Sequence, residues 1–81
     1  MKKNDNITER IIKVMSLVFN IDADKVNIGS SPDTIPQWDS LGHMNLIVAL
    51  EEEFNVSFTA EQLSEMLNFE LIHLYLKELL E

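Results

Sequence analysis

The stretch Trp38-Asp39-Ser40-Leu41-Gly42-His43-Met44-Asn45-Leu46-Ile47 contains the helix start around which the rest of the chain is interpreted. Asp39 is a good N-cap residue, because its side chain can accept hydrogen bonds from backbone N–H groups one turn into a helix. Pro36 and Trp38 keep the preceding chain out of that helix. Ser40 then occupies the first helical position and points outward, where its hydroxyl can carry a chemical modification.

The helix that begins here is predicted to run from about Ser40 to Phe54, because apolar residues recur at helical spacing. Its apolar face consists of Leu41, Met44, Ile47, Val48, Leu50 and Phe54. The residues Glu51, Glu52 and Glu53 lie near its end, where negative charge at the negative pole of the helix dipole costs about 0.3–1 kcal/mol per well-placed group. Helix stability alone therefore gives no reason for this cluster.

A first helix is predicted to begin at Ile7, with Asn6 as its N-cap and Glu9 as the capping-box partner. Residues 1–5 are mostly polar, and we expect them to be frayed. The apolar stripe of this helix is formed by Ile7, Ile11, Val14 and Val18 and is widened by Ile12, Met15 and Phe19. We interpret this helix as core scaffold.

Residues 20–37 break the helical pattern, apart from a possible single turn between Asp22 and Val26. Connections longer than about 12–15 residues in compact domains are usually functional or disordered. The apolar residues available to pin this connection across the helix ends are Ile21, Val26, Ile28 and Ile35. We therefore expect it to be ordered and to position Ser40.

The last third of the chain predicts a short third helix and a fourth helix. Thr59 with Gln62 forms a capping box, and Phe58 with Leu63 a hydrophobic staple, for a helix over about residues 60–67. Asn68 then caps the fourth helix, whose main face consists of Phe69, Ile72, Leu76 and Leu79, widened by Leu71, Leu74 and Tyr75. The predicted fold is all-α, a four-helix bundle with a long first loop and a short third helix.

Composition limits the classes of function. With 81 residues, the chain is predicted to be one domain, 1–81, with a single small core. It has no cysteine, so disulfides and thiolate metal sites are excluded. Fourteen acidic and six basic residues give a formal charge of −8, which disfavours nucleic acid and anionic membranes and favours basic partners. No stretch has the length of a membrane span, so we expect a cytoplasmic protein without stable membrane insertion.

The Asp39-Ser40-Leu41 tripeptide, followed by Ala49-Leu50-Glu51-Glu52-Glu53-Phe54, resembles the phosphopantetheine attachment site of the acyl carrier protein family. The resemblance extends more loosely from Ile7 to the C-terminus. It implies that Ser40, flanked by Asp39 and Leu41, bears phosphopantetheine derived from coenzyme A. It also implies that the protein is a carrier and not an enzyme, holding an acyl or aminoacyl group as a thioester on the arm.

The resemblance further implies which surfaces are used. A phosphopantetheinyl transferase and acyl-loading or acyl-transferring enzymes with basic patches are the expected partners of a monomeric carrier. The residues expected to dock them are Met44, Val48, Glu51 and Glu52. An attached acyl chain is expected to enter the bundle between Leu46, Ile47, Leu50, Met66, Ile72 and Leu76. For this last set, ordinary close core packing is the alternative explanation.

Three positions depart from the pattern of housekeeping fatty-acid carriers, which usually have acidic residues where this chain has Gly42 and Asn45. Those carriers also commonly have a small residue where this chain has Trp38. The departures resemble stand-alone carriers of specialised pathways, such as polyketide, surface-polysaccharide or aminoacyl systems. The sequence does not identify the carried group.

Other functions fit the sequence less well than the carrier. Ser40 and His43 share a helix face, but no acid is placed to orient His43 and the chain is too short to enclose a substrate. His43 and His73 are too few for a zinc site without cysteines, and each is interpreted as a helix-surface residue. The remaining alternative is an acidic helical adaptor without a prosthetic group. An adaptor would tolerate Ser40→Ala, whereas a carrier would not.

Overall fold

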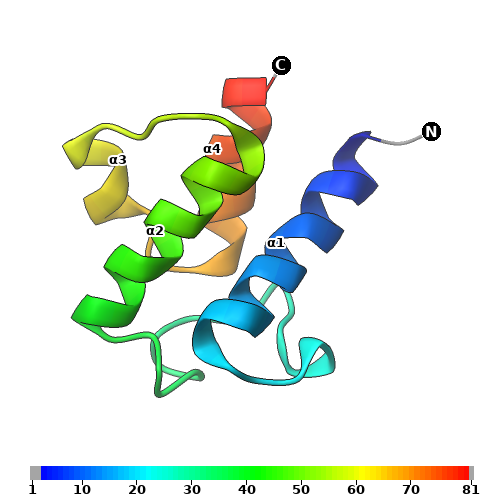
Figure 1. Ribbon diagram of the computed structural model, residues 1–81, viewed down its shortest axis with the longest axis vertical. Coiled ribbons are helices and arrows are strands. Elements are labelled where there is room, and N and C mark those ends of the chain that lie inside the picture. The colour runs from blue at the N-terminus through cyan, green and yellow to red at the C-terminus, as the bar shows by residue number, and fades with distance from the viewer. Residues whose placement is uncertain (1–2, 81) are drawn as a thin grey trace.

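The computed structural model describes the backbone of residues 3–80 and the side chains of residues 7–80. Within this range the chain is all-helical and has no strand. Its elements are α1 (Lys3–Phe19), the 3-10 turn η1 (Ala23–Lys25), α2 (Ser40–Phe54), α3 (Ala60–Glu65) and α4 (Phe69–Leu80). Figure 1 shows α1 and α4 packed beside and behind α2, with the short α3 on the other side of α2. The predicted all-α bundle with a long first connection and a short third helix is confirmed at this level.

The helix α1 begins at Lys3, so the predicted start at Ile7 is wrong. Asn6 lies inside the helix instead of capping it, because the sequence before Ile7 contains no proline or glycine to stop the helix from extending toward the N-terminus. The predicted fraying of residues 1–5 is wrong for residues 3–5, which belong to α1, and residues 1 and 2 lie outside the described residues. The predicted core stripe is largely confirmed, and its buried members are Ile7, Ile11, Val14, Met15 and Phe19.

The long connection between α1 and α2 is fixed at several points by hydrogen bonds and burial. Its first turn is η1, as predicted, and Val26 and Ile35 are buried in the core. Ile28 is 65% exposed, so its predicted role as an apolar pin is wrong. The reason is local, because Ser30 N–H donates to the Asn27 carbonyl at 2.9 Å and closes a turn that carries Ile28 at its tip.

Ser30, and not Ile28, fixes this part of the connection to the bundle. Ser30 is buried, its hydroxyl accepts from Asn27 N–H at 2.9 Å, and its carbonyl accepts from Phe69 N–H at 3.0 Å. Phe69 is the first residue of α4. The connection is thus joined to the start of the last helix, which holds it against the bundle.

The caps of α3 and α4 are those that the sequence predicts. The Thr59 hydroxyl accepts from Gln62 N–H at 3.1 Å, and the Gln62 side chain accepts from Thr59 N–H at 2.9 Å. The Asn68 side chain accepts from Leu71 N–H at 2.8 Å at the start of α4. The helix α3 ends at Glu65, earlier than predicted, because the next residue, Met66, turns into the core and is fully buried.

The core is one cluster built from all the long helices and the connection. Its fully buried large side chains are Ile11, Met15, Leu46, Leu50, Met66, Ile72 and Leu76. Leu79 was predicted to share the buried face of α4 but is exposed, because the last turn of α4 lies at the edge of the bundle near the C-terminus (Figure 1). No helix among the described residues is long and apolar enough to cross a membrane.

Candidate functional site

The start of α2 has the predicted geometry. Asp39 is the N-cap in extended conformation, and its side-chain Oδ1 accepts from Gly42 N–H at 2.8 Å. Its carbonyl accepts the first helical hydrogen bond from His43 N–H at 2.7 Å. Ser40 is the first residue of the helix and is exposed. The first turn of α2 contains no acidic residue, so the carboxylate bound to its N–H groups is that of the N-cap, Asp39.

Gly42 is required by sterics at this site. A Cβ built on Gly42 would lie 2.1 Å from the backbone carbonyl oxygen of Gln37, a separation that no real side chain adopts. The backbone of the connection therefore lies directly on the first turn of α2. Where the sequence suggested only a missing acidic residue, the structure shows that any side chain at position 42 would push this backbone away.

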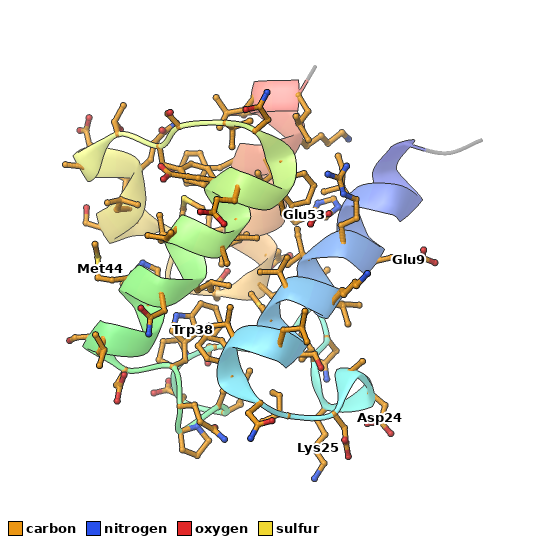
Figure 2. All side chains as sticks on the ribbon, viewed as in Figure 1. Glu9, Asp24, Lys25, Trp38, Met44 and Glu53 are labelled. Atoms are coloured by element: carbon orange, nitrogen blue, oxygen red, sulfur yellow. The ribbon has the colours of Figure 1, made fainter. Side chains whose placement is uncertain are left out.

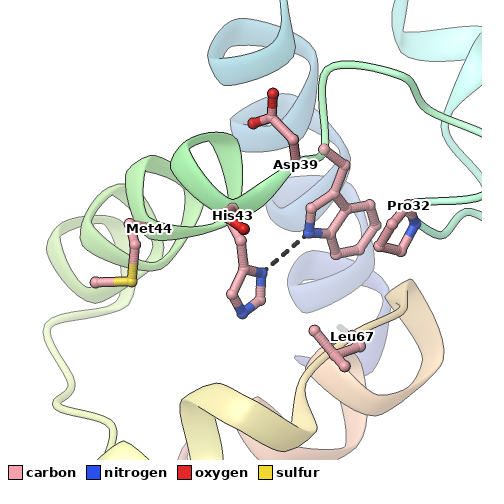
Figure 3. Close-up of a pocket in the computed structure, with 7 residues that line it drawn as sticks. Pro32, Asp39, His43, Met44 and Leu67 are labelled. Carbon is pink, nitrogen blue, oxygen red and sulfur yellow. Dashed lines mark hydrogen bonds between the residues drawn. The ribbon is translucent and has the colours of Figure 1, made fainter.

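A pocket of about 490 Å³ lies beside Ser40 and is partly open to solvent (Figure 3). Its volume is in the range of about 300–1,000 Å³ that is typical of small-molecule sites. Its lining is mainly apolar and consists of Pro32, Trp38, Asp39, Ser40, His43, Met44 and Leu67. The wall thus combines the end of the connection, the first turn of α2 and the segment after α3.

His43 links the end of the connection, α2 and α3. The Trp38 indole N–H donates to His43 Nδ1 at 3.0 Å, and His43 Nε2 lies 2.9 Å from the Leu63 carbonyl oxygen in α3 (Figure 3 shows the first bond). The prediction of His43 as a simple helix-surface residue is therefore wrong, since the ring is half-buried and both nitrogen atoms are engaged. Neither nitrogen is directed to Ser40, so the geometry offers no Ser-His pair.

One apolar stripe of α2 is exposed next to Ser40. Leu41, Met44 and Val48 are 71%, 49% and 51% exposed. They lie three and four residues apart and therefore on one helix face. Two of them, Met44 and Val48, are residues predicted to dock partners, and Leu41 is part of the predicted attachment site. Unpartnered apolar side chains in such a row are suited to contact another protein.

The three glutamates at the end of α2 differ in their contacts. The Glu51 side chain is half-buried and accepts from Phe58 N–H at 2.9 Å, which ties the α2–α3 loop to the helix. The Glu53 side chain accepts from Arg10 Nε at 2.8 Å. The Glu52 side chain is exposed. Among the side chains of residues 7–80, it is the one of these three glutamates that makes no ion pair or hydrogen bond.

These contacts correct the conclusion that stability gives no reason for the cluster. Arg10 places its guanidinium at the end of α2, where Nη2 donates to the Glu53 carbonyl at 2.6 Å and the group lies 4.3 Å from the centre of the Phe54 ring. Positive charge on the last carbonyls of a helix is favourable. Arg10 therefore offsets part of the negative charge at this end through a contact between α1 and α2 that no local pattern indicates. Figure 2 shows Glu53 beside α1.

The residues predicted to hold an acyl chain all lie in the core, and none of them lines the pocket beside Ser40. Leu46, Ile47, Leu50, Met66, Ile72 and Leu76 are each at most 2% exposed. The prediction that a chain enters between them therefore stays a prediction. Among the described residues, no group of three or more His, Cys, Asp or Glu is placed to hold a metal ion.

Four residues that line the pocket were not predicted as site residues from the sequence: Pro32, Trp38, His43 and Leu67. Only Gly42 within a helical pattern gave a local signal, because an isolated glycine in a helix usually marks a close approach. The scan of this chain against protein-family models finds no match, and the search of curated proteins finds no significant match.

Proposed function

We propose that this protein is a phosphopantetheine-dependent acyl carrier, with Ser40 as the residue that bears the arm. One observation carries the proposal: the serine of the Asp39-Ser40-Leu41 tripeptide is exposed at the first position of a 15-residue helix, directly after its N-cap. A transferase must reach this hydroxyl, and nothing in the described residues covers it. When bound, phosphopantetheine supplies a terminal thiol that holds an acyl group as a thioester.

The residues around Ser40 fit such a group. A phosphodiester there would add negative charge at the positive pole of α2, a placement typically favourable by about 0.3–1 kcal/mol when exposed. The first turn offers no competing acidic side chain, although the Asp39 carboxylate is already bonded to Gly42 N–H. The apolar pocket beside Ser40 gives the arm a surface to lie on.

Leu41, Met44 and Val48 support the second part of the proposal, that partners dock on α2. A transferase or acyl-transferring enzyme would cover this exposed stripe and meet Glu52 with a basic side chain. Tethering then presents the cargo at high effective concentration, so the chain itself performs no bond chemistry. This function places the protein in the cytoplasm with its enzymes, in a specialised biosynthetic pathway.

The test is incubation with coenzyme A and a promiscuous phosphopantetheinyl transferase, followed by intact mass measurement and peptide mapping. We expect one phosphopantetheine group, located on Ser40, and none on Ser40→Ala. The matched control is Ser57→Ala, which changes an exposed serine outside the motif and should be loaded normally. An unmodified Ser40, or modification of another serine in the wild-type chain, would refute the proposal.

The exposed stripe also suits the alternative, an acidic helical adaptor that binds a basic partner through α2 without a prosthetic group. The two functions differ at Ser40. An adaptor with Ser40→Ala keeps its partner binding and its cellular role, whereas a carrier with the same substitution keeps its fold and loses its role.

A further inference from the structure

The two hydrogen bonds of His43 fix the protonation of its ring. The Trp38 indole N–H is a donor only, and the Leu63 carbonyl is an acceptor only. His43 must therefore accept at Nδ1 and donate at Nε2. A single species meets both requirements, the neutral imidazole with its proton on Nε2. Neither the other neutral tautomer nor the imidazolium can accept from the indole.

These bonds connect the segments that surround Ser40. Trp38 lies two residues before Ser40 and is 2% exposed, with its ring 5.6 Å from that of Phe19. His43 lies in the first turn of α2, its ring 6.3 Å from the indole, and Leu63 belongs to α3. The imidazole is thus the polar link between the connection, α2 and α3. In Figure 3 the dashed line marks the hydrogen bond between the His43 ring and the Trp38 indole at the pocket.

We propose that His43 is a pH-sensitive switch for the segment that leads into Ser40. Protonation places a second N–H on Nδ1, directed at the indole N–H of Trp38, so this hydrogen bond is lost. The bond from Nε2 to Leu63 becomes charge-assisted and stronger. His43 then stays with α3 and releases Trp38, whose buried indole N–H is left without its acceptor. Acidification loosens residues 38–40 and the pocket wall.

The carboxylates next to these segments in the chain are Asp33 and Asp39 in the connection and Glu61 and Glu65 in α3, all exposed. Carboxylates ordinarily titrate near pH 4, whereas histidine is the side chain that ordinarily titrates between about pH 5 and 8. A transition at Trp38 in that range therefore reports on a histidine. His73 on α4 is the second histidine and serves as the control.

The inference does not depend on phosphopantetheine, and its test uses the unmodified chain. Ring ¹⁵N NMR of the wild type at neutral pH should show His43 with its proton on Nε2. Because a net hydrogen bond corresponds to roughly a two- to tenfold change in an equilibrium, the hydrogen-exchange protection of the Trp38 indole N–H should fall roughly two- to tenfold between about pH 8 and pH 5. The fall should follow the titration of the His43 ring.

Two variants assign the transition. His73→Gln should show the same fall in protection as the wild type, and His43→Gln should show none between about pH 8 and pH 5. Trp38 is the only tryptophan, so its indole signal needs no further assignment. A wild-type His43 with its proton on Nδ1 at neutral pH would refute the proposed switch. Protection of the Trp38 indole N–H that does not change with pH in the wild type, or an equal fall in His43→Gln, would also refute it.

Discussion

Replacing Glu51 by alanine tests whether the acidic end of α2 is structural or only a docking surface. The substitution removes the acceptor of Phe58 N–H in the loop that leads to α3. An N–H left without a partner in this half-buried place costs about 1–3 kcal/mol. Removing negative charge from the helix end stabilises the fold by about 0.3–1 kcal/mol. We expect a net loss of about 1–2 kcal/mol in the free energy of unfolding.

For a domain of this size, that loss corresponds to a decrease of roughly 5–15 °C in thermal midpoint. Glu52→Ala is the matched control, because it removes the same charge from the adjacent position, where the side chain is exposed and has no hydrogen bond. Its midpoint should be unchanged or slightly raised. Glu51→Gln keeps an oxygen acceptor without the charge, so it should retain most of the stability that Glu51→Ala loses.

Circular dichroism during thermal and urea unfolding measures all three variants. Equal midpoints for Glu51→Ala and Glu52→Ala, or a Glu51→Gln as unstable as Glu51→Ala, would show that the bond to Phe58 N–H contributes nothing. The result also decides how docking should be tested. Reversing both glutamates together would mix a folding defect with a docking defect, so charge reversal belongs at Glu52 alone.

Two further predictions concern Gly42 and Tyr75. Gly42→Ala should lower the thermal midpoint although alanine is the better helix former by about 1 kcal/mol, because its Cβ would meet the Gln37 carbonyl. Tyr75 donates a hydrogen bond to Glu65, and this bond raises the pKa of the Tyr75 hydroxyl above its ordinary value of 10.0. The neutral hydroxyl is the form that the fold favours, so this contribution is present below the ordinary pKa and is lost as the pH rises through the raised one. Ultraviolet absorbance should show the phenol ionising at lower pH in Glu65→Gln than in the wild type.

Each of these predictions has a control on the same helix or surface. Asn45→Ala is an exposed substitution in α2 that should be neutral or stabilising, so a loss equal to that of Gly42→Ala would remove the steric explanation. Glu61 affects the Tyr75 hydroxyl only through its charge and less strongly than Glu65. An equal change in titration for Glu61→Gln and Glu65→Gln would show that the hydrogen bond is absent.

The parts of the fold that the sequence predicts are those fixed within one helical turn. Asp39 and Ser40 mark the start of α2, and Thr59 with Gln62 marks the start of α3, because each cap is a bond between residues three apart. Such signals need no knowledge of what packs against the helix. Spacing alone predicts less: of the apolar face predicted for α2, Ile47, Leu50 and Phe54 are buried, whereas Leu41, Met44 and Val48 are exposed.

The predictions fail where a segment that is distant in the sequence determines whether a residue is buried or bonded. Leu79 has the spacing of a core residue, but the bundle ends before it, and Ile28 is carried outward by a turn that Asn27 and Ser30 close. The role of His43 depends on Leu63, twenty residues further along the chain. Arg10 is 43 residues from Glu53. No periodicity in a single helix encodes these contacts, so the pocket walls and the Arg10 contact at the end of α2 emerge only in three dimensions.

Trp38, Gly42 and His43 act as one structural unit at the start of α2. The absence of a side chain at Gly42 lets the Gln37 carbonyl lie on the first turn, and Trp38 is the next residue along the connection. That position brings the indole N–H within 3.0 Å of His43 Nδ1, one turn further into the helix. A large tryptophan before the N-cap therefore depends on both a glycine that admits the backbone and an imidazole that accepts its N–H. The three residues together set the shape of the pocket that Ser40 faces.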